Sequence, residues 1–302
     1  MRALASPASL KGVLSAREAA AALASGLRDG GAVAVELPIA DGGEGTAEVL
    51  GAEVVDAVQV HDAFGRPREA PIRSLGDDAV VEAADAIPLD PARLDPFAAS
   101  SRGLGELIAA VRDCRRLLVC LGGTANVDGG SGLGLDALPC ETVVLCDALV
   151  PLLDAARVFA RQKGASPGEA AELERRLAAM KELTPFAQLA GAGAAGGLGA
   201  RLASLGARLV PGSAYVLERI GFADRAREVD LVVTGEGTVD ATTTEGKAPG
   251  EAMRICRELG VRCVLFGGRI ETELEDVETA TLSGDPARAR EDLVQLGRRL
   301  AG

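Results

Sequence analysis

The sequence predicts an α/β protein in which a second α/β domain is inserted into the first. Two observations lead to this prediction. Short apolar runs at 32–40, 115–123, 229–237 and 261–268 each lead into a glycine-containing loop, and helical stretches lie among them. From residue 63 to residue 225, strands and helices alternate less regularly than near the two ends. We therefore expect one domain made of residues 1–62 and 226–302, and a second made of residues 63–225.

The first elements follow from capping patterns and periodicity. Ser15 and Glu18 form a capping-box pattern before an alanine-rich helical stretch, and Gly30 with Gly31 ends that stretch. The apolar run 32–40 predicts a strand. The residues "TAEVLGA" that follow the next loop predict the start of a helix.

The middle and the end of the chain predict further strands and helices. Short strands are expected within 69–84 and a helix within 167–183. The stretch "AGAGAAGGLGA" favours a tight glycine-rich helix that packs closely on a neighbour, with a phosphate loop as the alternative. The tail 285–302 predicts a closing amphipathic helix.

Composition and charge exclude several classes of partner. The chain carries a formal net charge of −12, with 48% hydrophobic and 25% charged residues, which is typical of a globular protein. A negative net charge repels phosphate backbones and anionic lipids, so we expect neither a nucleic-acid nor a membrane partner. There is no signal-like N-terminus and no apolar run of the ~18 residues that a membrane helix needs, so we expect a cytoplasmic protein.

The cysteines and the single histidine indicate no zinc site and no imidazole base. The six cysteines form no CxxC pair, and because several lie inside apolar runs we expect them to be buried thiols. His61 follows a short alternating strand and is expected at a surface or boundary position. A Ser-His-Asp or Cys-His mechanism would depend on this one residue.

The loop 41–46, "DGGEGT", holds two carboxylates and three glycines. Asp41 and Glu44 alone would repel a phosphate group, but with Mg²⁺ they can bind a metal–phosphate complex. A carboxylate beside a substrate hydroxyl can also accept its proton. The glycines would expose N–H groups to an anion at the start of the following helix. The alternative is a structural turn in which Asp41 or Thr46 caps the helix.

Two later loops repeat this combination of acids and glycines. "TGEGTVD" carries Glu236 and Asp240 and is followed by Lys247, while "GGTANVDGG" carries Asp128. Acid–glycine loops at three strand ends favour an acid–metal–phosphate site, because loops at the carboxyl ends of parallel strands gather at one edge of a sheet. The residues alone therefore predict a kinase-like or phosphatase-like enzyme, or a sugar-acid binder.

Two common nucleotide-binding patterns are not met. The Walker A pattern fails at Ala241 and Ala248, although Gly246 and Lys247 are present. The segment "GAGAAG" matches GxGxxG, but no convincing strand precedes it and no acidic residue follows on a second strand. Neither a P-loop nor a dinucleotide fold is expected.

The motifs together resemble those of the type I glycerate kinase family. The resemblance runs in order over most of the chain, through "KGVLSA", "PIADGGEGT", "SSRGLGELI", "GGTANVDGGSGLG", "RQKGAS", "GAGAAGGLGA" and "VVTGEGTVDATTTEGKAP". It implies ATP-dependent phosphorylation of a D-glycerate hydroxyl to phosphoglycerate, with ATP and Mg²⁺. It also implies a flavodoxin-like α/β domain built from both chain ends, with the second α/β domain inserted. A homodimer is among the assembly states that we consider.

The matching motifs imply three groups of site residues. The catalytic group, of which Asp41 and Glu236 would also be the metal ligands, comprises Asp41, Glu44, Glu236 and Asp240. The residues implied for substrate binding are Lys11, Gly42, Gly43, Gly45, Thr46, Arg102 and Lys163. Those implied for nucleotide binding are Gly122, Gly123, Asp128, Gly129, Gly130, Gly235, Gly237 and Lys247.

The chain departs from the family pattern at five positions, which are Ala8, Val127, Leu149, Val150 and Thr238. Thr238 stands where the family has an arginine, and threonine has neither the charge nor the reach of that side chain. Three alternatives stay open: a glycerate kinase, which we expect, a catalytically impaired binding or regulatory homologue, or a kinase of another small hydroxy acid. Arg66 or Arg269 could compensate for the missing arginine.

Overall fold

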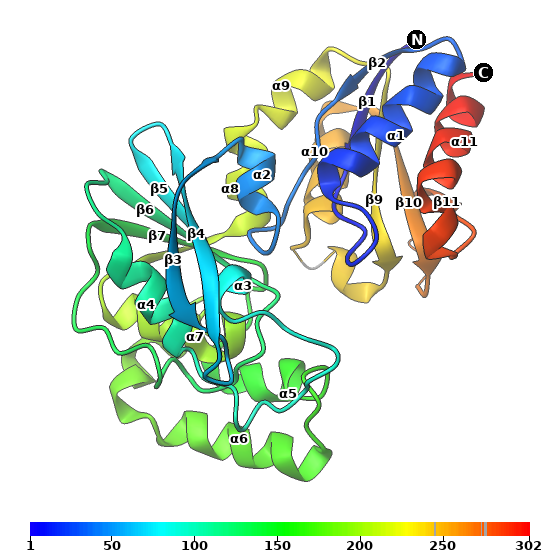
Figure 1. Cartoon of the computed structure of the whole chain (residues 1–302). Helices are drawn as coiled ribbons and strands as arrows, with labels where there is room; N and C mark the ends of the chain where they lie inside the picture. The colour runs from blue at the N-terminus through cyan, green and yellow to red at the C-terminus, as the bar shows by residue number, and fades with distance from the viewer. Residues whose placement is uncertain (245, 273, 275–276) are drawn as a thin grey trace. The chain divides into compact units, whose positions relative to one another are not determined.

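The computed structural model describes residues 1–244, 246–272, 274 and 277–302. The chain divides into two compact units (Figure 1). Unit 1 consists of Met1–Asp41, Glu48–Leu50 and Ser213–Gly302, and unit 2 of Gly42–Ala47 and Gly51–Gly212. Both chain ends therefore belong to unit 1, and almost all of the middle of the chain belongs to unit 2.

Unit 1 is built on a five-stranded parallel sheet in the order β11-β10-β9-β1-β2. Its strands are β1 (Arg2–Pro7), β2 (Val33–Glu36), β9 (Leu231–Val239), β10 (Arg262–Ile270) and β11 (Glu278–Thr281). Counted within unit 1 alone, the order is 2-1-3-4-5, which is the flavodoxin-like arrangement. The strand order reverses between β1 and β9, so this fold places its ligand crevice beyond the carboxyl ends of these two strands.

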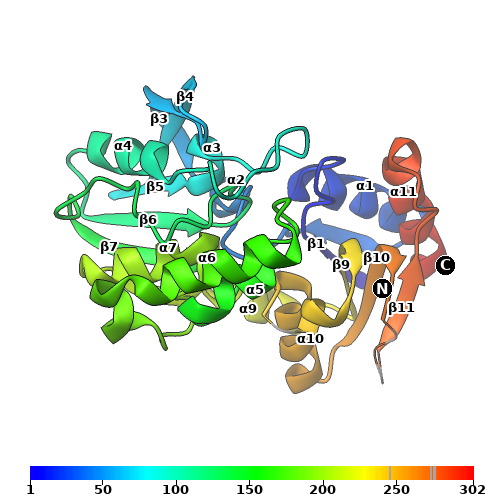
Figure 2. The same cartoon turned by 90° about the horizontal axis from the view of Figure 1, so that it is seen from below.

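Helices cover both faces of the unit 1 sheet. They are α1 (Ala16–Asp29), α8 (Gly212–Arg219), α9 (Phe222–Arg227), α10 (Ala248–Leu259) and α11 (Ala289–Ala301), with short 3₁₀ turns at η3 (Ala241–Thr244) and η4 (Pro286–Arg288). Helices α1 and α11 lie side by side on one face (Figures 1 and 2). Ala3 of β1 packs in their cluster, and Leu4 packs in the cluster of α9 and α10, because successive strand residues point to opposite faces.

Local sequence explains why α1 begins and how closely it packs. Ser15 and Glu18 form the predicted capping box, with hydrogen bonds of 3.2 and 3.0 Å. At Gly26 a Cβ atom would lie 1.9 Å from the carbonyl oxygen of Val294 in α11. Only glycine therefore permits this helix crossing.

Unit 2 contains a six-stranded mixed sheet in the order β3-β4-β5-β6-β7-β8. The strands are β3 (Glu53–His61), β4 (Pro67–Leu75), β5 (Asp78–Glu82), β6 (Arg116–Leu121), β7 (Glu141–Cys146) and β8 (Arg208–Pro211). The first three are antiparallel neighbours, and β5 to β8 are parallel. Strand β3 falls within the 1–62 segment expected for the first domain, but it forms a hairpin with β4 and so belongs to this sheet.

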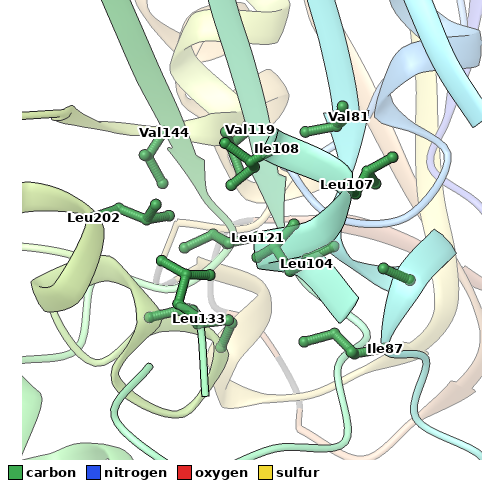
Figure 3. Packing of buried hydrophobic residues seen from close by; sticks show 14 of the residues in the cluster. Val81, Ile87, Leu104, Leu107, Ile108, Val119, Leu121, Leu133, Val144 and Leu202 are labelled. Carbon is green, nitrogen blue, oxygen red and sulfur yellow. The ribbon is translucent and has the colours of Figure 1, made fainter. Parts of the chain in front are cut away.

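The core of unit 2 lies between the sheet and its helices. These are α2 (Thr46–Leu50, shared with unit 1), α3 (Ala83–Ala86), α4 (Arg102–Ala110), α5 (Ala155–Phe159), α6 (Pro167–Ala179) and α7 (Ala194–Ser204), with 3₁₀ turns η1 (Leu152–Asp154) and η2 (Lys181–Phe186). Val119 of β6 and Val144 of β7 pack with Leu104 of α4 and Leu202 of α7 (Figure 3). Each such buried side chain stabilises the fold by roughly 1.5–3 kcal/mol. None of the helices in the described ranges is long and apolar enough to cross a bilayer.

The glycine–alanine stretch begins α7 and packs closely against the loop after β6. Ala195, Gly196 and Gly197 all have positive φ, between 49° and 97°. A Cβ atom on Gly196 would lie 2.3 Å from the carbonyl oxygen of Asn126. The close-packing interpretation of this stretch therefore accounts for its glycines.

Cys114 and Cys140 form a disulfide, which corrects the expectation that all six cysteines are thiols. Cys114 precedes β6 and Cys140 precedes β7, and these strands are parallel neighbours, so their starts meet. Their Cα atoms lie 6.7 Å apart. The free cysteines are Cys120, Cys146, Cys256 and Cys263, of which the first three are buried as expected.

We expect denatured protein prepared without reductant to contain four titratable thiols, and six after reduction. Replacing Cys140 with serine should lower the free energy of unfolding by about 3 kcal/mol, because the bond closes a loop with a sequence separation of 26 residues. Thiol titration and denaturant unfolding measure both effects. With reductant present, the wild type and the Cys140→Ser variant should have similar free energies of unfolding. Six titratable thiols in the unreduced wild type would contradict the pairing.

Candidate active site

Unit 1 brings Glu236, Asp240 and Lys247 together at the carboxyl end of β9. The Thr243 hydroxyl donates a hydrogen bond of 2.7 Å to Glu236 Oε1. Lys247 Nζ lies 3.4 Å from Glu236 Oε2 and 3.4 Å from Asp240 Oδ1. The Lys247 ammonium therefore lies between two carboxylates, at the residue that caps α10.

The two carboxylates of this cluster differ in their affinity for protons. Burial raises the pKa of Glu236, and the negative charge of Asp41 raises it further, against the opposing effects of Thr243 and Lys247. Burial would also raise the pKa of Asp240, but hydrogen bonds from Thr242 and the charge of Lys247 lower it overall. Glu236 therefore binds a proton more readily than an ordinary glutamate, and Asp240 less readily than an ordinary aspartate.

The same end of the sheet positions Gly235, Gly237 and Lys11. At Gly235 a Cβ atom would lie 2.2 Å from the carbonyl oxygen of Phe266 on β10, so this glycine permits close strand packing. At Gly237 it would lie 4.0 Å from the backbone nitrogen of Lys11, in the loop after β1. Lys11 is exposed. The carboxyl ends of β1 and β9, where the strand order reverses, thus carry acidic residues and two lysines.

The oxygen donors in unit 1 are chemically suited to a hard cation. Asp41 lies close enough to Glu236 for its charge to raise the pKa of Glu236, and a bound cation would relieve that repulsion. Within the described ranges, no three Asp, Glu, His or Cys side chains lie close enough together to hold a metal ion by themselves. Mg²⁺ commonly binds through one or two carboxylates and completes its coordination with phosphate and water. The Asp41–Glu236 pair fits that mode.

The glycine loop 42–47 lies in unit 2, at the carboxyl ends of its parallel strands. Gly42 has a φ of 94° and Gly45 a φ of 84°, which explains two of the three glycines. The third, Gly43, lies against Gly122 at the end of β6, where a Cβ atom on Gly122 would be 2.6 Å from the Gly43 Cα. Glu44, between these glycines, is exposed.

Three N–H groups of this loop already have protein acceptors. The Gly42 N–H donates to the Thr46 hydroxyl oxygen at 3.1 Å. The N–H groups of Gly45 and Ala47 donate to Glu82 at 3.0 and 2.7 Å. The prediction that the loop glycines expose their N–H groups to an anion is therefore wrong for Gly42 and Gly45, because side chains of this unit occupy those donors.

Two residues with contacts in these clusters were not predicted from the sequence: Glu82, which accepts from Gly45 and Ala47, and Thr243, which donates to Glu236. Glu82 ends β5 and follows the apolar run "AVV", so an acid at a strand end was the available signal. Thr243 lies in the threonine run after Asp240, and nothing in the sequence distinguished it from its neighbours.

Asp128 organises the loop after β6. Its carboxylate accepts hydrogen bonds of 2.7–3.2 Å from both the backbone and the side chain of Ser101, and from Asn126, Gly130 and Gly132. A carboxylate has about four lone-pair sites, so the protein itself occupies those of Asp128. A nucleotide contact at this side chain would have to displace one of these bonds.

The glycines predicted for nucleotide binding in this loop are explained by backbone conformation and packing. Gly123, Gly129 and Gly130 have φ values of 66°, 61° and 72°. A Cβ atom on Gly129 would lie 2.4 Å from the sulfur of Met180. These glycines allow the loop its turn and let neighbouring segments approach it.

Lys163 lies inside unit 2 and contacts the same loop. It is 4% exposed, and its ammonium donates to the carbonyl oxygen of Asn126 at 2.7 Å and to Thr124 Oγ1 at 3.4 Å. Burial lowers its pKa to about 8, against the charges of Asp147 and Asp128. The structure thus places Lys163 beneath the 122–134 loop, not on the surface of unit 2.

Arg102 is exposed at the first position of α4, directly after Ser101, which binds Asp128. Its guanidinium donates to Glu106 at 2.8 Å, and Glu106 also accepts bonds from the backbone and ring of His61. Burial would raise the pKa of Glu106, but these bonds lower it overall. His61 lies at the end of β3 and is partly exposed, as expected for a boundary residue.

The positions that depart from the family pattern lie in different surroundings. Val127 is buried in the core around α5 and α6, and Leu149 is 37% exposed. Thr238 on β9 is the register partner of Arg269 on β10. Arg269 is exposed, and no ion pair joins it to a residue in the described part of the chain. Arg66, the other candidate for compensation, pairs with Asp62 at 2.6 Å in the β3–β4 turn.

Comparison with known proteins relates the whole chain to one family. The model of the Glycerate kinase family matches residues 3–141 and 134–285. A glycerate kinase of Bacillus subtilis is 32% identical over 90% of this chain and 86% of its own length. A glycerate 2-kinase of Escherichia coli is 34% identical over 82% of this chain and 80% of its own.

The fold agrees with that relationship. The crystal structure of a protein described as putative glycerate kinase 2 from Salmonella typhimurium LT2 superposes with a TM-score of 0.77 at 29% identity, covering 100% of this chain and 97% of that one. The match in sequence and in fold extends over both units, which include all three acid–glycine loops. The chain belongs to the glycerate kinase family.

Proposed function

We propose that this protein transfers the γ-phosphoryl group of ATP to a hydroxyl group of D-glycerate, with Mg²⁺. Family membership supports the reaction, and the Glu236–Lys247 cluster at the switch point of the unit 1 sheet carries the assignment of residues. Partly buried carboxylates beside a lysine are an arrangement that suits the binding of a metal–phosphate complex in phosphoryl transfer.

The acidic residues can divide the work of the reaction. Asp41 and Glu236 would hold Mg²⁺, which when bound neutralises charge on the phosphate oxygens. Lys247, held by Glu236 and Asp240, would contact phosphate oxygens as a point charge. Because Glu44 is exposed whereas the Asp240 carboxylate is bonded to Thr242 and Lys247, Glu44 is our candidate proton acceptor.

The reaction step itself is a displacement at phosphorus. The acceptor hydroxyl oxygen forms a bond to the γ-phosphorus, and the bond from that phosphorus to the bridging oxygen breaks. The electron pair leaves on ADP, and the hydroxyl proton passes to the carboxylate. Positioning and charge stabilisation provide most of the acceleration in such reactions.

A coupled ADP-release assay with D-glycerate, ATP and Mg²⁺ should show saturable turnover. Asp41→Ala and Glu236→Ala should each lower kcat/KM by at least about a hundredfold, because several kcal/mol of charge stabilisation are lost. Glu228→Gln serves as the control, since this carboxylate is exposed and precedes the first residue of β9, whereas Glu236 lies near the last. A folded wild type without turnover, assayed beside an active family member, would favour the catalytically impaired homologue; turnover only with another hydroxy acid would correct the substrate.

The raised pKa of Glu236 predicts a pH dependence of both activity and stability. The carboxylate must be ionised to hold Mg²⁺. Activity should therefore rise at a higher pH than the ionisation of an ordinary glutamate would predict. The folded protein binds this proton more tightly than the unfolded chain, so the contribution of Glu236 to stability is present at low pH and is lost as the pH rises through its folded-state pKa.

Glu236→Gln tests this linkage, because the amide stays neutral at every pH. Relative to the wild type, its free energy of unfolding should increase between about pH 4 and about pH 8, measured by urea unfolding. A stability difference that does not change with pH would show that the pKa of Glu236 is the same in the folded and unfolded states.

Arg269 is expected to supply the positive charge that Thr238 lacks. The two residues are register partners on adjacent parallel strands, so their side chains lie on the same face of the sheet. Arg269→Ala should lower kcat/KM roughly tenfold to hundredfold, the loss typical of one hydrogen bond to a charged group.

The double variant Thr238→Arg with Arg269→Ala should recover part of the lost activity. Arg299→Ala, at an exposed position on α11, is the control for removal of a surface arginine. Unchanged kinetics in Arg269→Ala would contradict compensation by this residue.

A further inference from the structure

Glu82 is a buried carboxylate whose two oxygens bind two backbone N–H groups of one loop. It is 4% exposed, at the last position of β5. Oε2 accepts from Gly45 at 3.0 Å and Oε1 accepts from Ala47 at 2.7 Å. Both donors lie more than thirty residues away in the sequence, on either side of Thr46.

We propose that Glu82 is a positioning residue of the active site, which fixes the backbone on which Glu44 stands. The peptide that follows Glu44 is the one whose N–H group donates to Glu82, so a shift of this bond moves Glu44 directly. The inference rests on the proposed function, because Glu44 is our candidate proton acceptor.

The geometry requires an ionised carboxylate at this place. A glutamine has one carbonyl oxygen and one NH₂ group, so it can accept from only one of the two loop N–H groups, and its NH₂ would face the other donor. An aspartate keeps both oxygens but is one methylene shorter. Each change therefore removes a different part of the two-point contact with Gly45 and Ala47.

Burial and neighbouring charges act on the carboxylate of Glu82. Burial raises the pKa of Glu82 despite the two N–H donors; Asp85 raises it further and Arg73 lowers it. Arg73 itself pairs with Asp85 at 2.6 Å. The ionised form of Glu82 is thus less favourable in the folded protein than in water, because the two N–H bonds offset only part of the effect of burial.

The test compares Glu82→Gln with the wild type in two measurements. The first is kcat with D-glycerate, ATP and Mg²⁺, which should fall roughly tenfold to hundredfold because a small misplacement of a reacting group has that effect. The second is hydrogen exchange of the loop peptide that contains Gly45 and Ala47, which should become faster. Glu69→Gln, an exposed glutamate on the neighbouring strand β4, is the matched control and should change neither.

Each outcome supports or overturns the proposal. Unchanged loop exchange in Glu82→Gln overturns it, and so does faster exchange with unchanged kcat. If the wild type shows no turnover with D-glycerate, the proposed function fails by itself; the exchange measurement still decides whether Glu82 positions the loop.

A second approach needs no variant and covers the case in which Glu82→Gln does not fold. In the wild type, loop exchange corrected for intrinsic base catalysis should slow as the pH rises and Glu82 ionises, with Asp85 and Arg73 as the neighbouring charged groups. Loop protection that does not change with pH, in a protein that stays folded, would contradict the assignment.

Discussion

Parallel pairing of β1 with β9 is the constraint on which unit 1 depends. It joins segments 228 positions apart, and only in this pairing do the loops after the two strands lie at one edge of the sheet. Such a contact must overcome a large loop-closure entropy, which grows slowly with length. The buried apolar residues of both sheet faces provide the compensating free energy.

Electrostatics explains why the acidic residues at this edge can lie close together. Glu236 and Asp41 repel each other, and Lys247 offsets part of that repulsion from between Glu236 and Asp240. Each contact of Lys247 is a charge pair at 3.4 Å and not a tight bidentate bond. The lysine can therefore leave one carboxylate for a phosphate oxygen, and the carboxylate can then bind a cation. In unit 2, by contrast, Asp128 and Lys163 are bonded within the protein and organise one loop.

Sequence patterns predicted most of the fold and located the candidate site only in outline. Ser15 and Glu18 determine the start of α1 by local hydrogen bonds, so this boundary could be read directly. The boundary between the two domains was harder to predict, because β3 belongs to the second sheet through hairpin pairing with β4. The Cys114–Cys140 bond escaped prediction for the same kind of reason: it depends on which strands are neighbours.

The sequence by itself determined the α/β class, the family and the acid–glycine loops, because these depend on residue type and on spacing along the chain. Only the tertiary structure decided the role of each polar group. In the folded chain the N–H groups of Gly45 and Ala47 donate to Glu82, and Arg269 is the register partner of Thr238. A hydrogen bond or a register pair depends on distances between segments far apart in sequence, and no local pattern contains those distances.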